Sequence, residues 1–354
     1  MIDPVDPAAW VCPLPLRNHD RIVTGHGGGG QMSGELVEHI FLPAFGRSAV
    51  AGLHDSATMD PPVDGGRLAF STDSFVVSPL FFAGGDIGRL AVNGTVNDLA
   101  MSGARPLALS AAFILGEGLE LAVLAAVAES MGRAAQTAGV KVATGDTKVV
   151  ESAGDEVLYI NSSGIGVVPP KVDIRPGRAA AGDAVLLSGP IGEHGIAVMS
   201  QRSGLEFGTG VQSDTAPLAG MVASMLGACA DIHVLRDPTR GGLAGALCEI
   251  AAGAGVGIEF DEDSVPVPDE VAAACAFLGL DPTHVANEGK LVAIVPADAA
   301  DEVLAAMRSQ PEGEGAVRIG HVVADHPGVV AAYTPLGALR VVDQPLGEQL
   351  PRIC

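Results

Sequence analysis

Short apolar runs with the pattern of β-strands alternate with amphipathic helical patterns along most of this chain. The clearest helical pattern covers 119–136, where every fourth residue from Leu119 to Met131 is apolar. Apolar strand patterns flank it at 107–115 and 140–150. Strands and helices that interleave in this way define the mixed α/β class, so we expect an α/β (α+β) fold.

The alternation occurs in two halves. Pro169, Pro170 and the loop 171–183 interrupt it and predict a domain boundary. In the first half we expect strands at 67–79, 107–115, 140–150 and 157–168 and helices at 33–45, 86–101 and 119–136. In the second half we expect strands at 184–188, 231–236, 256–260, 290–295, 316–323 and 328–333 and helices at 192–203, 215–228, 240–253 and 298–309. The predicted units are an N-terminal extension (1–24), an N-terminal domain (25–170), a C-terminal domain (171–342) and a flexible tail (343–354).

The net charge is strongly negative, at −22, with 42 Asp and Glu against 20 Lys and Arg. Such a chain should repel nucleic acid and anionic membranes, although backbone N–H groups and a bound cation can still hold a phosphate. No apolar run is long enough to span a membrane, and the N-terminus lacks the pattern of a signal peptide. The five cysteines are scattered without a C-x-x-C pair, which favours a reducing, cytoplasmic location.

A run of glycines, GHGGGG, extends from Gly25 to Gly30 and formally contains the G-x-G-x-x-G pattern of dinucleotide sites. Such a site also needs an acidic residue about 20 positions later, at the end of a second strand. No clear strand pattern precedes Asp55, so a loop that covers phosphates fits this run better. An ordinary surface loop is the remaining alternative. The G-x-x-x-x-G-K-[ST] motif of P-loop proteins does not occur.

Five aspartates share one setting, beside Gly, Thr, Ser or Asn and next to an apolar run. They are Asp55, Asp73, Asp98, Asp146 and Asp237. Mg²⁺ takes carboxylate oxygens and shares them with nucleotide phosphates. Each aspartate alone could equally be a turn or N-cap residue, but their recurrence favours a magnesium and phosphate site. The histidines show no spacing typical of a transition-metal site.

Two motifs combine opposite charges with turn residues. RDPTRGGL begins at Arg236 before a helical pattern, and its N–H groups could hold an anion. NEGK begins at Asn287 and places an acid and a base in one turn. A capped helix start and a solvated turn are the respective alternatives.

The last residue, Cys354, ends a tail with two prolines and no periodicity. A thiol there has no evident packing role and could serve as a nucleophile or an attachment point. The tail is not a C-a-a-X box, because the cysteine is last. An accidental terminal cysteine is the alternative.

Together these motifs resemble the HypE family of hydrogenase maturation factors, which are carbamoyl dehydratases. The family belongs to the superfamily of aminoimidazole ribonucleotide synthetase and selenophosphate synthetase. The resemblance runs from about Gly25 to Cys354 through HGGGG, STDSFVVSP, GGDIGRLAVNGTVNDLAMSGA, TGDTKVV, GEHGIAVMS, RDPTRGGL, ANEGK and LPRIC. The terminal PRIC separates this family from its small-molecule relatives. Gly116 stands where we would expect an acid, and Cys248 where the family often has Asn.

The resemblance implies an N-terminal ATP-binding domain whose sheet pairs across a homodimer, and a C-terminal α/β domain. It implies that ATP lies under the glycine loop and that aspartates hold Mg²⁺. The expected nucleotide-binding residues are Gly27, Gly28, Gly29, Gly30, Asp55, Asp146, Asn97 and Arg236, and the expected metal ligands are Asp73, Asp98 and Asp237.

The resemblance also implies the reaction, the ATP-dependent dehydration of an S-carboxamide on Cys354 to a thiocyanate. The partner carbamoyltransferase HypF would load the carbamoyl group, and the cyanide would pass to iron on the HypC–HypD scaffold of [NiFe]-hydrogenase maturation. Phosphorylation makes the amide oxygen a good leaving group. Glu288 is our candidate base for the amide protons, and Lys148 our candidate for stabilising charge on the oxygen side.

Three other functions stay open from the sequence. The first is a synthetase of the same superfamily that phosphorylates a free small molecule, which would be active without the tail. The second is a non-catalytic nucleotide sensor or scaffold, which would bind ATP without releasing phosphate. The third is a nicotinamide dehydrogenase, which a titration with NADH would reveal.

Overall fold

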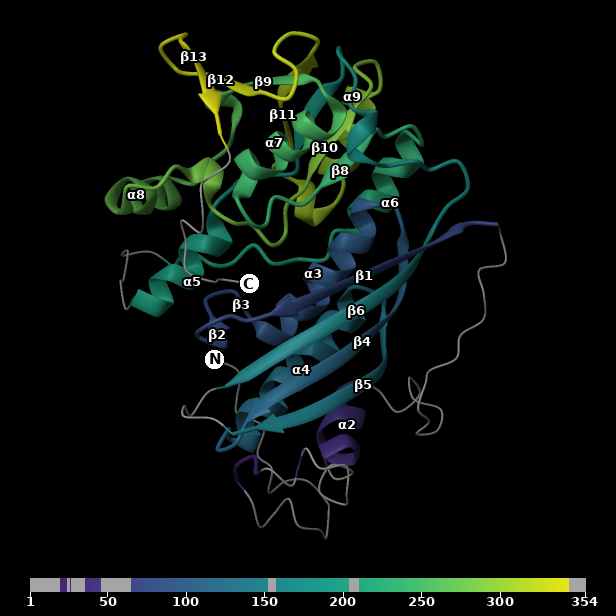
Figure 1. The fold of residues 1–354 in the computed structure, drawn as a ribbon, viewed down its shortest axis with the longest axis vertical. Helices are drawn as coiled ribbons and strands as arrows, with labels where there is room; N and C mark the ends of the chain where they lie inside the picture. Colours follow the sequence, from purple (N-terminus) through teal and green to yellow (C-terminus); the bar gives the residue numbers. More distant parts are fainter. Residues whose placement is uncertain are drawn as a thin grey trace.

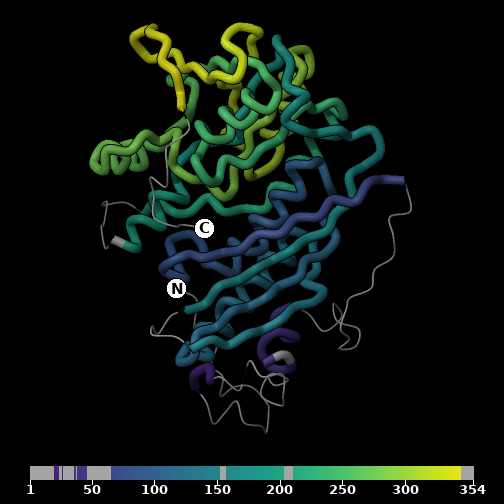
Figure 2. Tube along the Cα trace, viewed as in Figure 1, coloured from purple at the N-terminus to yellow at the C-terminus, as the bar shows by residue number. Residues whose placement is uncertain are grey.

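The structure is a computed structural model that describes residues 20–23, 26, 36–45, 65–151, 157–203 and 210–343. The N-terminal extension up to residue 19, Gly27 to Gly30 and Asp55 lie outside the described residues, as does the tail from residue 344 with Cys354. The first and second halves of the described chain occupy separate parts of the molecule (Figures 1 and 2).

The N-terminal half is built on a four-stranded sheet of order β1-β6-β4-β5. Its strands are β1 (Arg67–Phe75), β4 (Arg105–Gly116), β5 (Lys141–Val150) and β6 (Leu158–Val168). Strands β4 and β5 are parallel, and α4 (Leu121–Thr137) connects them, whereas the other neighbours are antiparallel. A parallel pair needs such a crossover, which explains the helical pattern between two strand patterns.

Helices α3 (Ile87–Met101) and α4 cover one face of this sheet (Figure 1). Asp86 caps α3 by accepting hydrogen bonds from the Gly88 and Arg89 N–H groups at 2.8 and 3.1 Å. The short hairpin of β2 (Phe81–Phe82) and β3 (Gly85–Asp86) leads into this cap. Helix α3 is buried on nearly all sides, because the C-terminal half packs against the side that faces away from the sheet.

The other face of the N-terminal sheet is exposed among the described residues. Side chains alternate between the faces of a strand. Leu68 and Phe70 of β1 are 67% and 71% exposed, and Ile114 of β4 and Tyr159 of β6 lie on the same face. We call this surface, together with Val150 of β5, the open sheet face.

The C-terminal half contains a seven-stranded sheet of order β13-β12-β9-β11-β7-β10-β8. Its strands are β7 (Ala184–Leu187), β8 (Val234–Arg236), β9 (Gly257–Asp261), β10 (Val292–Val295), β11 (Val317–Val323), β12 (Val330–Tyr333) and β13 (Leu339–Val342). Helix α7 (Gly242–Ala254) packs on one face, and α6 (Ala219–Ala228) and α9 (Ala300–Arg308) pack on the other. Strand β7 is buried on both faces, which explains its uninterrupted apolar sequence.

The remaining elements lie at the periphery. They are η4 (Val37–Phe41), α2 (Leu42–Phe45), η6 (Pro176–Arg178), α5 (Glu193–Ser203), η7 (Glu262–Ser264), α8 (Asp269–Leu278), η8 (Pro282–His284) and η9 (Pro311–Gly313). The π-helical turn η4 and α2 lie against α4, and the Phe41 and Phe113 rings stack with centroids 4.9 Å apart. No helix in the described parts of the chain has the length and apolar character needed to cross a membrane.

The structure confirms most predicted elements and corrects some. The predicted helices at 86–101, 119–136, 240–253 and 298–309 correspond to α3, α4, α7 and α9 with bounds shifted by at most two residues. The sequence reasoning missed α8 and β13, and the predicted helix at 215–228 begins only at Ala219. The preceding residues form no helix because Asn97 of α3 holds them, with the Leu218 N–H donating to Asn97 Oδ1 at 2.8 Å.

Candidate active site

A polar pocket of about 400 Å³ lies where the two halves meet. Its lining includes Asp73 of β1, Asp98 of α3, Arg236 and Asp237 at the end of β8, and Glu288. These five residues come from four separate segments, and all five were predicted site residues. The other lining residues are Thr72, Gly94, Thr239, Arg240, Ala246 and Glu249.

The position of each carboxylate follows from the element that carries it. Asp73 lies two positions after Ser71 and two before Phe75, which is buried in the core, so these residues share the strand face toward α3. The Ser71 hydroxyl donates to Asp98 Oδ2 at 2.7 Å and thereby joins β1 to α3. Asp237 follows the short strand β8 directly. The end of a strand in one half and a helix of the other therefore bring their carboxylates together.

The carboxylates of this pocket raise one another's pKa. Burial and then the charge of Asp98 raise the pKa of Asp237 to about 6. Burial, with a further contribution from Asp73, raises the pKa of Asp98. Burial and then the charges of Asp237 and Asp214 raise the pKa of Glu288 well above its ordinary value. Such perturbed groups in a cleft are typical of functional sites.

The donor set suits a cation that is shared with a phosphate. Among the described residues, no group of three His, Cys, Asp or Glu side chains is arranged to hold a metal ion by itself. Mg²⁺ is usually bound by one or two carboxylates and completes its shell with phosphate oxygens and water. Asp73, Asp98 and Asp237 supply such oxygens. The raised pKa values of Asp98 and Asp237 indicate that positive charge is favoured here. Arg236 and Arg240 of the same pocket could face the phosphates.

Asn97, a predicted nucleotide-binding residue, makes hydrogen bonds between the two halves of the chain. Asn97 is buried, and its Nδ2 donates to the carbonyl oxygens of Ala216 and Glu288 at 3.0 and 3.2 Å. Its Oδ1 accepts the Leu218 N–H. Asn97 is absent from the pocket lining and instead joins α3 to two segments of the C-terminal half.

Lys148 and Asp146 also lie away from the pocket of their own chain. Asp73 is in register with Ser162, Ala111 and Gly145, and Lys148 is three residues beyond Gly145 on the far strand β5. Three strand spacings and three residues separate Lys148 from Asp73 by roughly 17 Å. Lys148 pairs with Asp146 at 3.2 Å, and both side chains are 64% exposed on the open sheet face.

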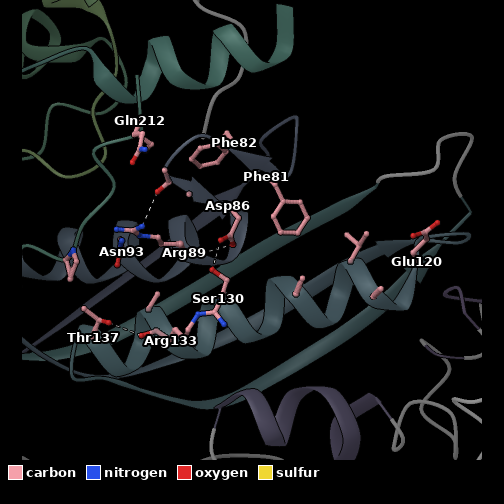
Figure 3. A pocket seen from close by; sticks show the side chains of 18 residues that line it. Phe81, Phe82, Asp86, Arg89, Asn93, Glu120, Ser130, Arg133, Thr137 and Gln212 are labelled. Atoms are coloured by element: carbon pink, nitrogen blue, oxygen red, sulfur yellow. Dashed lines mark hydrogen bonds between the residues drawn. The ribbon is translucent and has the colours of Figure 1, made fainter. Parts of the chain in front are cut away.

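A second and larger cavity, of about 1220 Å³, runs along α4 (Figure 3). Asp86 and Ser130 meet there in a hydrogen bond, and the Arg89 guanidinium donates to the Gly84 carbonyl at 3.0 Å. Burial raises the pKa of Asp86, whose Oδ1 already caps α3. The polar groups of this cavity thus serve the fold, and the carboxylates converge in the smaller pocket.

Sequence reasoning missed several residues of the smaller pocket, among them Thr72, Thr239 and Glu249. Thr72 directly precedes Asp73, and Thr239 lies two residues after Asp237, so proximity to a motif could have suggested both. Glu249 lies about two turns into α7, and its Oε2 accepts a hydrogen bond from Arg236 at 2.5 Å. No local sequence pattern predicts this contact, because the two residues are 13 positions apart.

Both halves match models of one class of proteins. Residues 53–168 match the N-terminal domain of AIR synthase related proteins, and residues 180–332 match the C-terminal domain of the same class. The fold is therefore the two-domain α/β fold of this class, with the acidic pocket between its domains.

Comparison with individual relatives identifies the family within this class. The carbamoyl dehydratase HypE of Rhizobium leguminosarum bv. viciae is 52% identical over 335 residues, covering 94% of this chain and 95% of its own length. A crystal structure of the hydrogenase maturation protein HypE in complex with ATP superposes with a TM-score of 0.90 at 47% identity, covering 94% of this chain and 99% of that one. The structure of a HypE–HypF complex matches with a TM-score of 0.77 at 43% identity and covers 90% and 100% of the two chains. The chain belongs to the HypE family of carbamoyl dehydratases.

Proposed function

We propose that this protein uses ATP to dehydrate a carbamoyl group on the sulfur of its own Cys354, as the terminal step of making a thiocyanate for hydrogenase maturation. The convergence of Glu288 with Asp73, Asp98, Asp237 and Arg236 in one pocket carries this proposal. The pocket offers acidic oxygens for a cation, guanidinium groups for phosphates and a buried carboxyl group for proton transfer. These are the groups that a phosphorylation followed by an elimination requires.

The chemistry balances as follows. The carboxamide oxygen attacks the γ-phosphoryl group of ATP, so an O–P bond forms and ADP leaves. The C–O bond then breaks with release of inorganic phosphate, while the nitrogen loses two protons and the carbon–nitrogen triple bond forms. The net products are thiocyanate, ADP, phosphate and one proton. A bound Mg²⁺ would offset negative charge on the transferring phosphoryl group.

Glu288 is the proposed acceptor of the nitrogen protons. Its buried position excludes water. Burial, and then the charges of the neighbouring carboxylates, raise the pKa of Glu288 and so favour its protonated form while no positive charge is present. Positive charge in the pocket favours ionised Glu288, because it offsets the repulsion from Asp237 and Asp98. Glu288 would therefore become an effective base only when the nucleotide and its cation are bound.

Lys148 can take part only if a second copy brings it to the pocket. Its own chain holds it on the open sheet face, three strands away from Asp73. The apolar side chains of that face, including Leu68 and Phe70, are exposed and would be buried by a sheet of another protomer. We therefore propose a homodimer that pairs the open sheet faces and in which Lys148 of one protomer serves the pocket of the other.

The thiol chemistry supports Cys354 as the acceptor. Burial raises the pKa of Cys248 and of Cys275 to about 11, so these thiols are poor nucleophiles. The proposal places the protein in the reducing cytoplasm, with HypF as the source of the carbamoyl group and the HypC–HypD scaffold as the acceptor of cyanide. The resemblance to the chain of a HypE–HypF complex supports the first of these partners.

Intact mass spectrometry tests the proposal. The protein is incubated with HypF, carbamoyl phosphate and Mg-ATP, and Cys354 should first gain about 43 Da and then retain about 25 Da after water is lost. Glu288→Gln should stop at the first adduct, because HypF makes that bond and the loss of a general base typically slows the next step about 10²- to 10⁴-fold. The matched control is Glu129→Gln, which alters a half-exposed carboxyl group of α4 outside this pocket and should leave both steps at the wild-type rate.

Two outcomes would contradict the proposal. Thiocyanate formation at the wild-type rate in Glu288→Gln would remove Glu288 as the base. Cyanide release from a Cys354→Ala protein would remove the protein's own tail as substrate and would favour a synthetase that phosphorylates a free small molecule.

A further inference from the structure

A segment without regular secondary structure, residues 212–218, contacts α3 before α6 begins, and we call it the strap. The Ser213 N–H donates to the Ala83 carbonyl at 2.8 Å. Asn93 Nδ2 of α3 donates to Thr215 Oγ1 at 3.2 Å, and Asn97 donates to the Ala216 carbonyl. The strap therefore belongs to the C-terminal half of the sequence but is fixed to the N-terminal half along its length.

Asp214 extends from the strap to the turn that carries Glu288. Its Oδ1 accepts the Glu288 N–H at 3.1 Å, and its Oδ2 accepts the Gly289 N–H at 3.3 Å. Asn97 binds the Glu288 carbonyl from the α3 side. Both the N–H and the carbonyl oxygen of Glu288 are thus hydrogen-bonded. The side chain of Glu288 lies in the acidic pocket.

The charge of Asp214 is buried and balanced. Its side chain is only 1% exposed, and Lys290 Nζ lies 3.5 Å from its Oδ2 and 3.6 Å from Glu193 Oε2. A buried carboxylate needs such a counter-ion and hydrogen-bond donors. Lys290 is thus the counter-ion that Asp214 shares with Glu193, which explains the base in the NEGK motif.

Gly289 permits the close approach of the two segments. A methyl group at this position would overlap the Asp214 carbonyl oxygen, and the backbone of Ala216 is also near. The strap and the Glu288 turn are therefore in backbone contact.

We propose that Asp214, with Lys290 as its counter-ion, is the positioning residue of Glu288 and sets the place of this carboxyl group relative to the aspartates of the N-terminal half. The inference rests on the proposed function of Glu288. Because the strap is anchored on α3, which also carries Asp98, the two carboxyl groups share one support. A displacement near 1 Å in such a site can cost about 10²-fold in rate.

A double-mutant cycle on the full-length protein tests this inference. Asp214→Asn keeps the shape but replaces one acceptor oxygen by a donor and removes the charge. We expect the rate of dehydration of carbamoylated Cys354 to fall about 10- to 100-fold, while the KM for ATP changes less than about threefold. In a Glu288→Gln background the same substitution should cause no further loss, because Asp214 acts through Glu288.

Asp183→Asn is the matched control. Asp183 is also buried, accepts the Ala180 N–H at 2.8 Å and pairs with His233 at 2.7 Å, but it lies outside the pocket lining. This variant should dehydrate at the wild-type rate. If Asp214→Asn does not fold, Gly289→Ala tests the same positioning without changing a charge, and it should accumulate the carbamoyl adduct.

The outcomes distinguish the positioning role of Asp214 from the catalytic role of Glu288. Equal losses from Asp214→Asn in the presence and absence of Glu288 would overturn the inference and leave Glu288 as the base. Full activity of Asp214→Asn beside an inactive Glu288→Gln would do the same. Full activity of Glu288→Gln would instead refute the proposed function.

Discussion

At the scale of single residues, the acidic pocket is costly for the folded protein when no positive charge is bound. Asp237 is buried beside Asp98, and its ionisation must overcome both desolvation and repulsion, which raises its pKa to about 6. Burial and neighbouring carboxylates also raise the pKa of Glu288 and of Asp98. Ionising these carboxyl groups in the folded protein costs free energy. A cation in the pocket offsets this cost, so the pocket favours cation binding.

The first prediction concerns the pH dependence of stability. The folded protein holds the Asp237 proton more tightly than the unfolded chain, whose pKa is near 3.8. The stabilising contribution is therefore present below pH 4 and is lost as the pH rises to about 6 and beyond. Without Mg²⁺, Asp237→Asn should be about 1 to 3 kcal/mol more stable than the wild type at pH 7.5 and nearly equal at pH 4. Denaturant titrations at the two pH values measure this, and an equal difference at both would contradict it.

A second prediction addresses Asp98 as a ligand of the magnesium–nucleotide complex. Asp98→Asn removes the negative charge but keeps an oxygen that can accept from Ser71. Mg-dependent ATP hydrolysis or binding should fall at least about tenfold, a loss near 1.4 kcal/mol. Asp173→Asn, at an exposed ion pair with Arg175, is the control. Unchanged nucleotide affinity and turnover would show that Asp98 is not a ligand.

At the scale of elements, α3 connects the fold to the site. It carries Asp98 on one side, holds the strap through Asn97 on another, and is buried in the cores of both halves. Asp86 determines where this helix begins, and Ser130 of α4 donates to the second carboxyl oxygen of the cap. The start of α3 is therefore fixed by both its own cap and the neighbouring helix.

The cap gives a third prediction. Asp86→Ala leaves the Gly88 and Arg89 N–H groups and the Ser130 hydroxyl without their acceptor, and it should lower the free energy of unfolding by about 1 to 3 kcal/mol. Asp86→Asn keeps an acceptor for the N–H groups and should cost less. Asp269→Ala, at the exposed start of α8, is the control and should cost under about 0.5 kcal/mol. Chemical denaturation measures all three, and equal losses in Asp86→Ala and Asp269→Ala would rule out the cap.

At the scale of the whole molecule, the open sheet face is the feature that a single chain leaves incomplete. Phe70 of β1 and Ile114 of β4 are exposed there, although they stand in a sheet whose other face is well covered (Figure 1). Lys148 and Asp146 lie on the same face. If the proposed homodimer forms through this face, one contact both buries the apolar side chains and assembles the catalytic groups.

The fourth prediction tests this interface. Phe70→Glu places a charge among apolar side chains and should convert a dimer into monomers in light scattering at micromolar concentration. Phe277→Glu, on α8 and 74% exposed, is the control and should leave the dimer intact. A dimer that persists in Phe70→Glu would place the interface elsewhere.

A fifth prediction follows if the pockets are shared between protomers. Lys148→Ala and Glu288→Gln should each be inactive as pure dimers. Random exchange of their subunits should restore about a quarter of the wild-type activity, since half of the dimers would then contain one intact pocket. No recovery after confirmed exchange would show that Lys148 does not act across the dimer.

The alternation of apolar patterns determined the class of fold, because a strand or a helix must bury its apolar side wherever it finally packs. The setting of Asp73, Asp98 and Asp237 likewise showed which aspartates to consider, since small polar neighbours beside an apolar run are a local property of the sequence. Only the tertiary structure decided which residues meet. Asp214 contacts a residue 74 positions away, and Asn97 binds the strap 119 positions away. Lys148 was assigned to chemistry by its neighbours in sequence, yet strand order and register place it far from Glu288's pocket. Contacts between distant segments depend on register, burial and the packing of both halves, and no local pattern encodes them.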